Sequence, residues 1–226
     1  MSELVLWHGS PKNVTDPQLQ MGKLHNDYGQ GFYCTESREL AKEWACATPL
    51  QNGYANQYIL KTDDLKILDL SDASFHILNW LAILAEHRDF HVSTVIGKEG
   101  KKYLREQFYV DLSEYDLVRG YRADDSYFSF ARAFVNNSIT VEQLAEAMRL
   151  GNLGEQIVLK SPNAFQQLTY IGKEFAESSV YFTKRETRSR RAEKDFLTIQ
   201  QRSGLQGLYL ADIIRERITN EDMRLR

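Results

Sequence analysis

The stretch LVLWHGS, residues 4–10, is an apolar run that ends at a histidine, a glycine and a hydroxyl side chain. The alternation within residues 4–7 predicts a buried β-strand. His8, Gly9 and Ser10 then lie at the exposed exit of that strand. A polar strand end that includes a glycine lets a ligand approach the backbone closely.

The composition is that of a globular protein with a sizeable core, since 42% of the 226 residues are hydrophobic and 26% are charged. The length lies at the upper end for one compact domain, or fits a domain with an appendage. The formal net charge of −3 excludes a general polyanion binder but leaves room for a local basic patch.

Cysteine usage and the apolar stretches predict the compartment. Cys34 and Cys46 form no CxxC pair and lack the spacing of a zinc site, so we expect a reduced cytoplasmic protein without a metal. Residues 1–30 do not resemble a signal peptide. The longest apolar stretch, 77–85, is too short to span a bilayer, so no membrane association is expected.

Short strands and separate helices predict an α+β fold rather than a doubly wound sheet. Thr140 and Gln143 form the pattern of a capping box at the start of one helix. Besides the first strand, we expect strands at 31–35, at 115–121, at 155–161 and on both sides of 62–64. The expected helices cover 36–47 (with Thr35 or Ser37 as N-cap), 74–88, 98–106, 126–137, 140–151, a short segment from 162 and part of the tail.

Three short motifs are candidates for chemistry: HGS at 8–10, NDYGQGFYCT at 26–35 and EQIVLKS at 155–161. Each is weak alone, because a lone histidine or a strand tyrosine is usually an ordinary packing residue. DYGQGFY also fits a turn with Gly29 and Gly31 at positive φ. The order of the motifs and their places on three predicted strands make the combination more specific.

In that order, the motifs resemble the bacterial ADP-ribosyltransferase-like proteins, which share an HGS strand, a DFGxGFYxT stretch and a late QxVhKT-like strand. Residues 115–148 also resemble the central region of that family, with GYRADD matching its GxxADD element. This family is placed in the His-Tyr-Glu/Gln branch of the superfamily that holds diphtheria toxin and the poly(ADP-ribose) polymerases. The resemblance covers about residues 4–170. It implies a split β-sheet core with flanking helices as an NAD-binding domain over 1–176. We expect residues 177–226 to form a basic and helical extension packed on the same domain.

The resemblance also implies NAD as co-substrate, without a metal, and assigns roles at the site. The backbone of Gly9 would bind the nicotinamide carboxamide, with Ser10 helping to fix it. His8 would donate to a ribose hydroxyl, and Tyr33 would stack on the cationic nicotinamide. The implied catalytic residues are His8, Tyr33 and Gln156. The implied NAD-binding residues are His8, Gly9, Ser10, Asp27, Gly31, Phe32 and Tyr33, with Asp27 holding its loop over NAD.

Two neighbouring residues are candidates for the functional position of the third motif. We favour Gln156 over Glu155, because successive strand residues point to opposite faces. A glutamine can orient a ribose hydroxyl but cannot act as a base. Activation of the nucleophile would then come from Asp27, Asp124 or Asp125, or the acceptor would be reactive by itself.

Residues 184–194, KRETRSRRAEK, are locally basic. One interpretation is a solvated helix face with ion pairs at i, i+4 spacing. The other is a phosphate-binding surface near the acceptor side of the NAD cleft. Its candidate residues are Arg185, Arg188, Arg190 and Arg191.

These observations lead to the hypothesis of an NAD-dependent mono-ADP-ribosyltransferase, a cytoplasmic bacterial toxin or phage-defence effector. The resemblance implies a cognate antitoxin protein, and the acceptor could be RNA, DNA or protein. Two alternatives stay open: an NAD glycohydrolase, and a non-catalytic module that binds NAD or ADP-ribose, which the glutamine at 156 keeps possible.

Overall fold

The computed structural model describes residues 2–89, 92, 94–123, 125–152, 154–202 and 207–225, with the side chains at 125, 126 and 152 outside the description. It is an α+β fold with two sheets, which confirms the predicted class. The strands are β1 (Glu3–Ser10), β2 (Phe32–Cys34), β3 (Gly53–Lys61), β4 (Ile67–Asp69), β5 (Leu117–Tyr121), β6 (Glu155–Leu159) and β7 (Leu168–Ala176). The helices are α1 (Arg38–Ala45), α2 (Ile77–His87), α3 (Val95–Phe108), α4 (Asp125–Val135), α5 (Val141–Ala147), α6 (Pro162–Gln166), α7 (Ser178–Gln201) and α8 (Leu210–Arg215).

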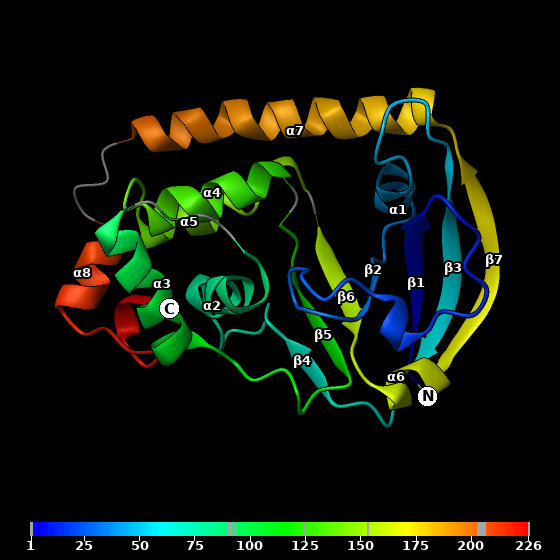
Figure 1. Ribbon diagram of the computed structural model, residues 1–226, viewed down its shortest axis with the longest axis horizontal. Helices are drawn as coiled ribbons and strands as arrows, with labels where there is room; N and C mark the ends of the chain where they lie inside the picture. The colour runs from blue at the N-terminus through cyan, green and yellow to red at the C-terminus, as the bar shows by residue number, and fades with distance from the viewer. Residues whose placement is uncertain are drawn as a thin grey trace.

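The two sheets lie next to each other (Figure 1). The first is antiparallel with the order β1-β3-β7. The second has the order β2-β6-β5-β4, in which β6 pairs antiparallel with both β2 and β5, while β4 and β5 are parallel. Because β1 and β2 are the facing edges, the first and second motifs meet where the sheets adjoin.

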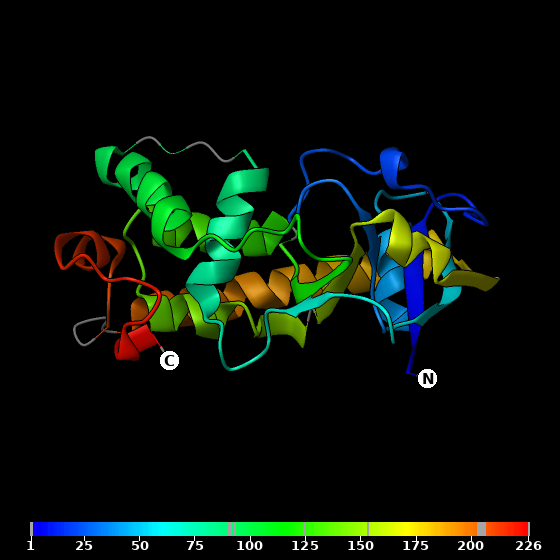
Figure 2. The same ribbon diagram turned by 90° about the horizontal axis from the view of Figure 1, so that it is seen from below.

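Helices cover the other side of the second sheet and contain most of the larger core. The apolar helix expected at 74–88 is α2, whose residues 77–85 are all buried. Helices α3 and α5 pack against α2, while α4 packs against α3 and α5, and α8 packs against α3. Helix α7 runs along the molecule from the first sheet towards α8 (Figures 1 and 2). The segment after residue 176 supplies buried core residues such as Phe196, Ile199 and Ile213. No helix in the described part of the chain has both the length and the hydropathy needed to cross a membrane.

Local sequence signals account for the ends of several helices. The predicted capping box is present: Gln143 N–H donates to Thr140 Oγ1 at 3.3 Å, and Thr140 N–H donates to Gln143 Oε1 at 2.9 Å. Ser37, one of the two expected N-caps, caps α1. Gly151 was expected to stop α5, but this helix already ends at Ala147 with Met148 as its C-cap. Gly151 has the left-handed conformation of a helix-stopping glycine (φ 64°), in the 3₁₀ turn that follows.

Candidate functional site

The sheets separate just after a single bridge between β1 and β2. Trp7 N–H donates to Thr35 O at 2.8 Å, and Thr35 N–H donates to Trp7 O at 2.9 Å; the described residues form no further β-bridge between these strands. In an antiparallel register the next hydrogen-bonded pair would be Gly9 with Tyr33. Instead, the side chain of His8 binds the Tyr33 carbonyl, with 2.7 Å between Nδ1 and O. The ladder therefore opens into a gap at His8.

Gly9 presents its backbone to this gap. Alternate residues of a strand direct their N–H and C=O groups to opposite edges, so the groups of Gly9 face the same side as those of Trp7, towards β2. On another side of Gly9, helix α1 packs so closely that it leaves no room for a side chain. A Cβ on Gly9 would lie 2.1 Å from Ala41 O and 2.8 Å from Ala45 N. Glycine here allows both the open backbone and the close approach of the helix.

This close approach predicts that Gly9→Ala destabilises the protein by about 1–3 kcal/mol, since the methyl group would displace the α1 backbone. Urea unfolding measures the difference. Gly172→Ala in β7 is the matched control, because a Cβ there has no heavy atom within 4 Å. Equal stability of the two variants would contradict the requirement for glycine at position 9.

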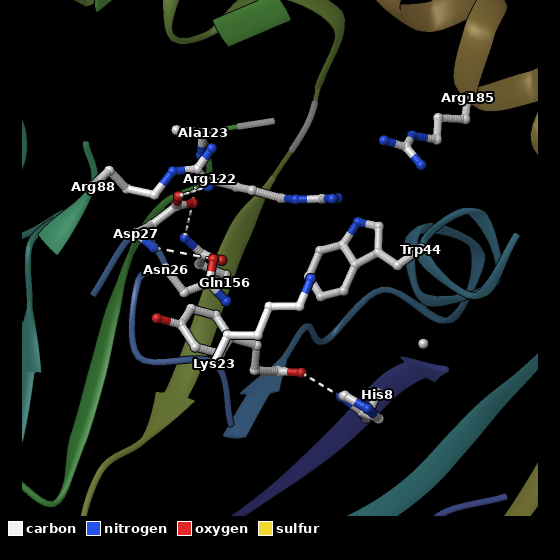
Figure 3. Close-up of a pocket in the computed structure, with 12 residues that line it drawn as sticks. His8, Lys23, Asn26, Asp27, Trp44, Arg88, Arg122, Ala123, Gln156 and Arg185 are labelled. Atoms are coloured by element: carbon white, nitrogen blue, oxygen red, sulfur yellow. Dashed lines mark hydrogen bonds and ion pairs between the residues drawn. The ribbon is translucent and has the colours of Figure 1, made fainter. Parts of the chain in front are cut away.

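A cavity of about 330 Å³ lies at the opening between the sheets (Figure 3). The strand residues His8, Tyr33 and Gln156 all line it, from β1, β2 and β6 respectively. Its other lining residues are Gly9, Lys23, Asn26, Asp27, Trp44, Arg88, Arg122, Ala123 and Arg185. A second hollow of about 850 Å³ shares several of these residues and is also lined by the loop of residues 14–26. The structure thus brings the three predicted catalytic residues to one cavity.

His8 is a neutral imidazole in this environment, because burial lowers its pKa. The Tyr33 carbonyl only accepts hydrogen bonds, so Nδ1 carries the ring proton and Nε2 is an acceptor. We expected His8 to donate to a ribose hydroxyl; with Nδ1 bound to the Tyr33 carbonyl, Nε2 is an acceptor and cannot donate. Phe32 packs on His8 with 4.4 Å between the ring centroids and is itself almost fully buried.

The hydroxyl of Tyr33 ties the preceding turn to β2. It donates to Gly29 O at 2.6 Å and accepts from Tyr28 N–H at 3.0 Å. Of the two glycines expected at positive φ, only Gly29 has it (72°). Gly31 is needed for space, because a Cβ there would lie 2.9 Å from Leu159 O of β6. Burial raises the pKa of Tyr33, so the phenol stays protonated.

Gln156 and Asp27 form a buried hydrogen-bonded pair (Figure 3). Gln156 Nε2 donates to Asp27 Oδ2 at 2.9 Å and to the Tyr121 carbonyl at 3.1 Å. Asp27 Oδ2 also accepts from Ala123 N–H at 2.8 Å, and Oδ1 pairs with Arg88 Nη1 at 3.0 Å. Burial raises the pKa of Asp27, although these donors and Arg88 act against the shift.

The neighbouring acids take other positions. Glu155 does not line the cavity and pairs with Arg119 at 3.1 Å, as the alternation along β6 leads one to expect. Asp124 lies outside the described residues, and so does the side chain of Asp125. Ser10 and Gly31 line the larger hollow, not the 330 Å³ cavity.

Of the four candidate arginines, only Arg185 lines the cavity with the strand residues. Arg188 is bound to the Glu43 carboxylate at 2.6 and 3.0 Å. Arg190 and Arg191 pair within α7, with Glu186 and Asp195 respectively, each at 3.8 Å. The ion-paired helix face therefore describes most of this segment, and Arg185 is the exception.

Four further side chains line the cavity without a prediction from the sequence: Lys23, Trp44, Arg88 and Arg122. The Arg122 guanidinium lies 4.3 Å from the centre of the Trp44 ring. Arg122 follows β5 directly, and a charged residue at a strand exit is a usable signal. Trp44 fitted the apolar side of α1 and gave no such signal. The described residues contain no group of three or more side chains suited to a metal ion.

The fold and site define an α+β protein whose cavity lies where two sheets part. A family model described as "Protein of unknown function (DUF3990)" matches residues 4–170, which is most of the chain. The chain belongs to this DUF3990 family. No curated protein and no solved structure matches the chain significantly.

Proposed function

We propose that the protein is an NAD-dependent mono-ADP-ribosyltransferase with a split-sheet ADP-ribosyltransferase core. The observation that carries the proposal is the convergence of His8, Tyr33 and Gln156 on one cavity, beside the open backbone of Gly9. These groups suit a nicotinamide riboside. The carboxamide needs one donor and one acceptor, which Gly9 offers, and the cationic ring gains from an aromatic face such as Tyr33.

Transfer of ADP-ribose from NAD requires that the site stabilise a positive charge that develops on the ribose. Departure of nicotinamide leaves an oxocarbenium-like carbon, as in glycoside hydrolysis. A hydrogen bond from a ribose hydroxyl to a neutral oxygen or nitrogen of the protein strengthens as that charge develops. Gln156 Oε1 and His8 Nε2 are such hydrogen-bond acceptors. The C–N bond to the ribose breaks with its electron pair leaving on nicotinamide, the nucleophile bonds to the anomeric carbon, and its proton passes to solvent.

The charge and size of the cavity suit the rest of NAD. Lys23 and Arg122 are cationic lining residues beyond the Arg88–Asp27 pair, which favours a diphosphate. The larger hollow adjoining the cavity is within the usual range for ligand sites and has room for the adenosine half.

The acceptor would approach from the side of Trp44 and Arg185, contributed by α1 and α7. An indole and a guanidinium can hold a base and its phosphate, which supports a nucleic-acid acceptor. A cytoplasmic toxin or phage-defence role with a cognate antitoxin rests on the resemblance of the motifs to the bacterial ADP-ribosyltransferase-like proteins.

Labelled NAD tests the function. We expect the purified protein to release nicotinamide, and to transfer label to a macromolecule when cell lysate is added. Label lost only after nuclease treatment identifies a nucleic-acid acceptor, and label lost only after protease treatment identifies a protein. Rapid nicotinamide release without any label transfer would instead indicate an NAD glycohydrolase. NAD binding without release would indicate a binding module.

Arg185→Glu in the same assay separates the acceptor side from NAD chemistry. We expect label transfer to nucleic acid to fall about tenfold, since a reversed charge repels phosphate, while basal nicotinamide release changes little. Arg190→Glu is the control, because Arg190 is exposed and does not line the cavity. Equal transfer by both variants would remove Arg185 from acceptor binding.

A further inference from the structure

The carboxamide of Gln156 has one orientation in which all its contacts are satisfied. Its Nε2 has acceptors on two sides, Asp27 Oδ2 and the Tyr121 carbonyl. An amide rotated by 180° would place Oε1 against these two acceptors and lose both bonds. Among the described residues no donor binds Oε1, so this oxygen remains for a ligand in the cavity that Gln156 lines.

Asp27 is itself held from three directions. Arg88 at the end of α2 pairs with Oδ1, while Ala123 N–H after β5 and Gln156 of β6 donate to Oδ2. Only 3% of Asp27 is exposed. A buried carboxylate that accepts hydrogen bonds from three donors is a rigid support for a neighbouring side chain.

We propose that Asp27 is a positioning residue that fixes the Gln156 carboxamide with its oxygen available to the ribose, a role that rests on the proposed ADP-ribosyltransferase function. Asp27 is then not the base that activates the nucleophile, because both of its oxygens already accept hydrogen bonds from protein donors. It acts through Gln156, and its loss changes the orientation of the acceptor rather than removing a proton carrier.

The test compares wild type, Asp27→Asn and Asp116→Asn in nicotinamide release from NAD. An asparagine at 27 offers one acceptor oxygen, so either Arg88 or the donors on Oδ2 would face its amide N–H. We expect kcat to fall roughly 10- to 100-fold while KM for NAD changes less than about threefold, the pattern of a misdirected contact. Asp116 accepts from Lys66 N–H at 2.9 Å and from Ser161 outside the cavity, so Asp116→Asn controls for lost stability alone.

A kcat of Asp27→Asn equal to that of wild type would overturn the positioning role and leave the proposed function standing. Absence of nicotinamide release from wild type would instead reject the proposed function and, with it, this role. Asp27→Ser puts no amide N–H against the donors and gives the same comparison if the asparagine variant does not fold. A proportional loss of kcat in Asp116→Asn would attribute the effect to stability and also overturn the role.

Discussion

Gln156→Glu is expected to lower the free energy of unfolding at pH 7 by about 3–4 kcal/mol, and to regain most of it on acidification. In the wild type Nε2 lies between two acceptors, Asp27 Oδ2 and Tyr121 O. A glutamate there places a second carboxylate against that of Asp27. The nearby negative charge raises the pKa of the glutamate. It fits the site only when protonated, because a protonated carboxyl can still donate one hydrogen bond.

The sign of the pH dependence follows from this raised pKa. In the unfolded chain a glutamate has a pKa of about 4.3. Keeping it neutral in the folded protein at pH 7 therefore costs about 1.4 kcal/mol for each pH unit between that pKa and pH 7. The stability is fully present below pH of about 4 and is lost as the pH rises towards the folded-state pKa. Thermal unfolding of wild type and variant between pH 4.5 and 8, spanning roughly that window, measures the difference.

Gln166→Glu is the control, since Gln166 is exposed on α6 and a carboxylate there stays hydrated. We expect its stability to follow that of wild type at every pH. A Gln156→Glu variant as stable as wild type at pH 7 would show that the position accommodates a charged carboxylate, and would remove the argument that Asp27 selects an amide there.

The strand positions of the site were open to prediction because they depend on local patterns. The alternation in LVLWHGS places His8 at the exit of β1, and GFYCT places Tyr33 in β2. The same alternation separates Gln156 from Glu155 along β6. These side chains are fixed by their own strand, so the sequence near each residue carries the information.

Other members of the cavity depend on packing between distant segments. Trp44 lies in α1 and Arg88 directly follows α2, and they reach the cavity only because these helices pack beside the opening between the sheets. Which of the six basic residues of 184–194 lines the cavity depends on where the carboxylates of α1 and α7 lie, because these carboxylates pair with the other arginines. The tautomer of His8 depends on a carbonyl 25 residues away. No periodicity along the chain encodes such contacts.

Replacing Tyr33 by alanine and by phenylalanine separates the two tasks of this residue. We expect Tyr33→Ala to weaken NAD binding roughly 10- to 30-fold, because a cation over a desolvated aromatic face gains up to about 2 kcal/mol. Tyr33→Phe keeps the ring and should bind NAD nearly as well as wild type. Calorimetric titration with NAD measures both affinities.

Tyr33→Phe should lose stability although it keeps its affinity for NAD. Tyr33→Phe loses the hydroxyl that serves Gly29 O and Tyr28 N–H, and leaving such groups unpaired costs about 1–3 kcal/mol. Tyr54→Ala is the control for removal of a strand tyrosine, because Tyr54 packs on Phe175 and does not line the cavity. If Phe and Ala at position 33 weakened NAD binding equally, the hydroxyl and its turn would control affinity, and stacking of nicotinamide on this ring would be excluded. Retained affinity in Tyr33→Phe with reduced stability is the pattern expected from the proposed NAD site, since the ring borders the cavity while the hydroxyl points back into the turn that carries Asp27.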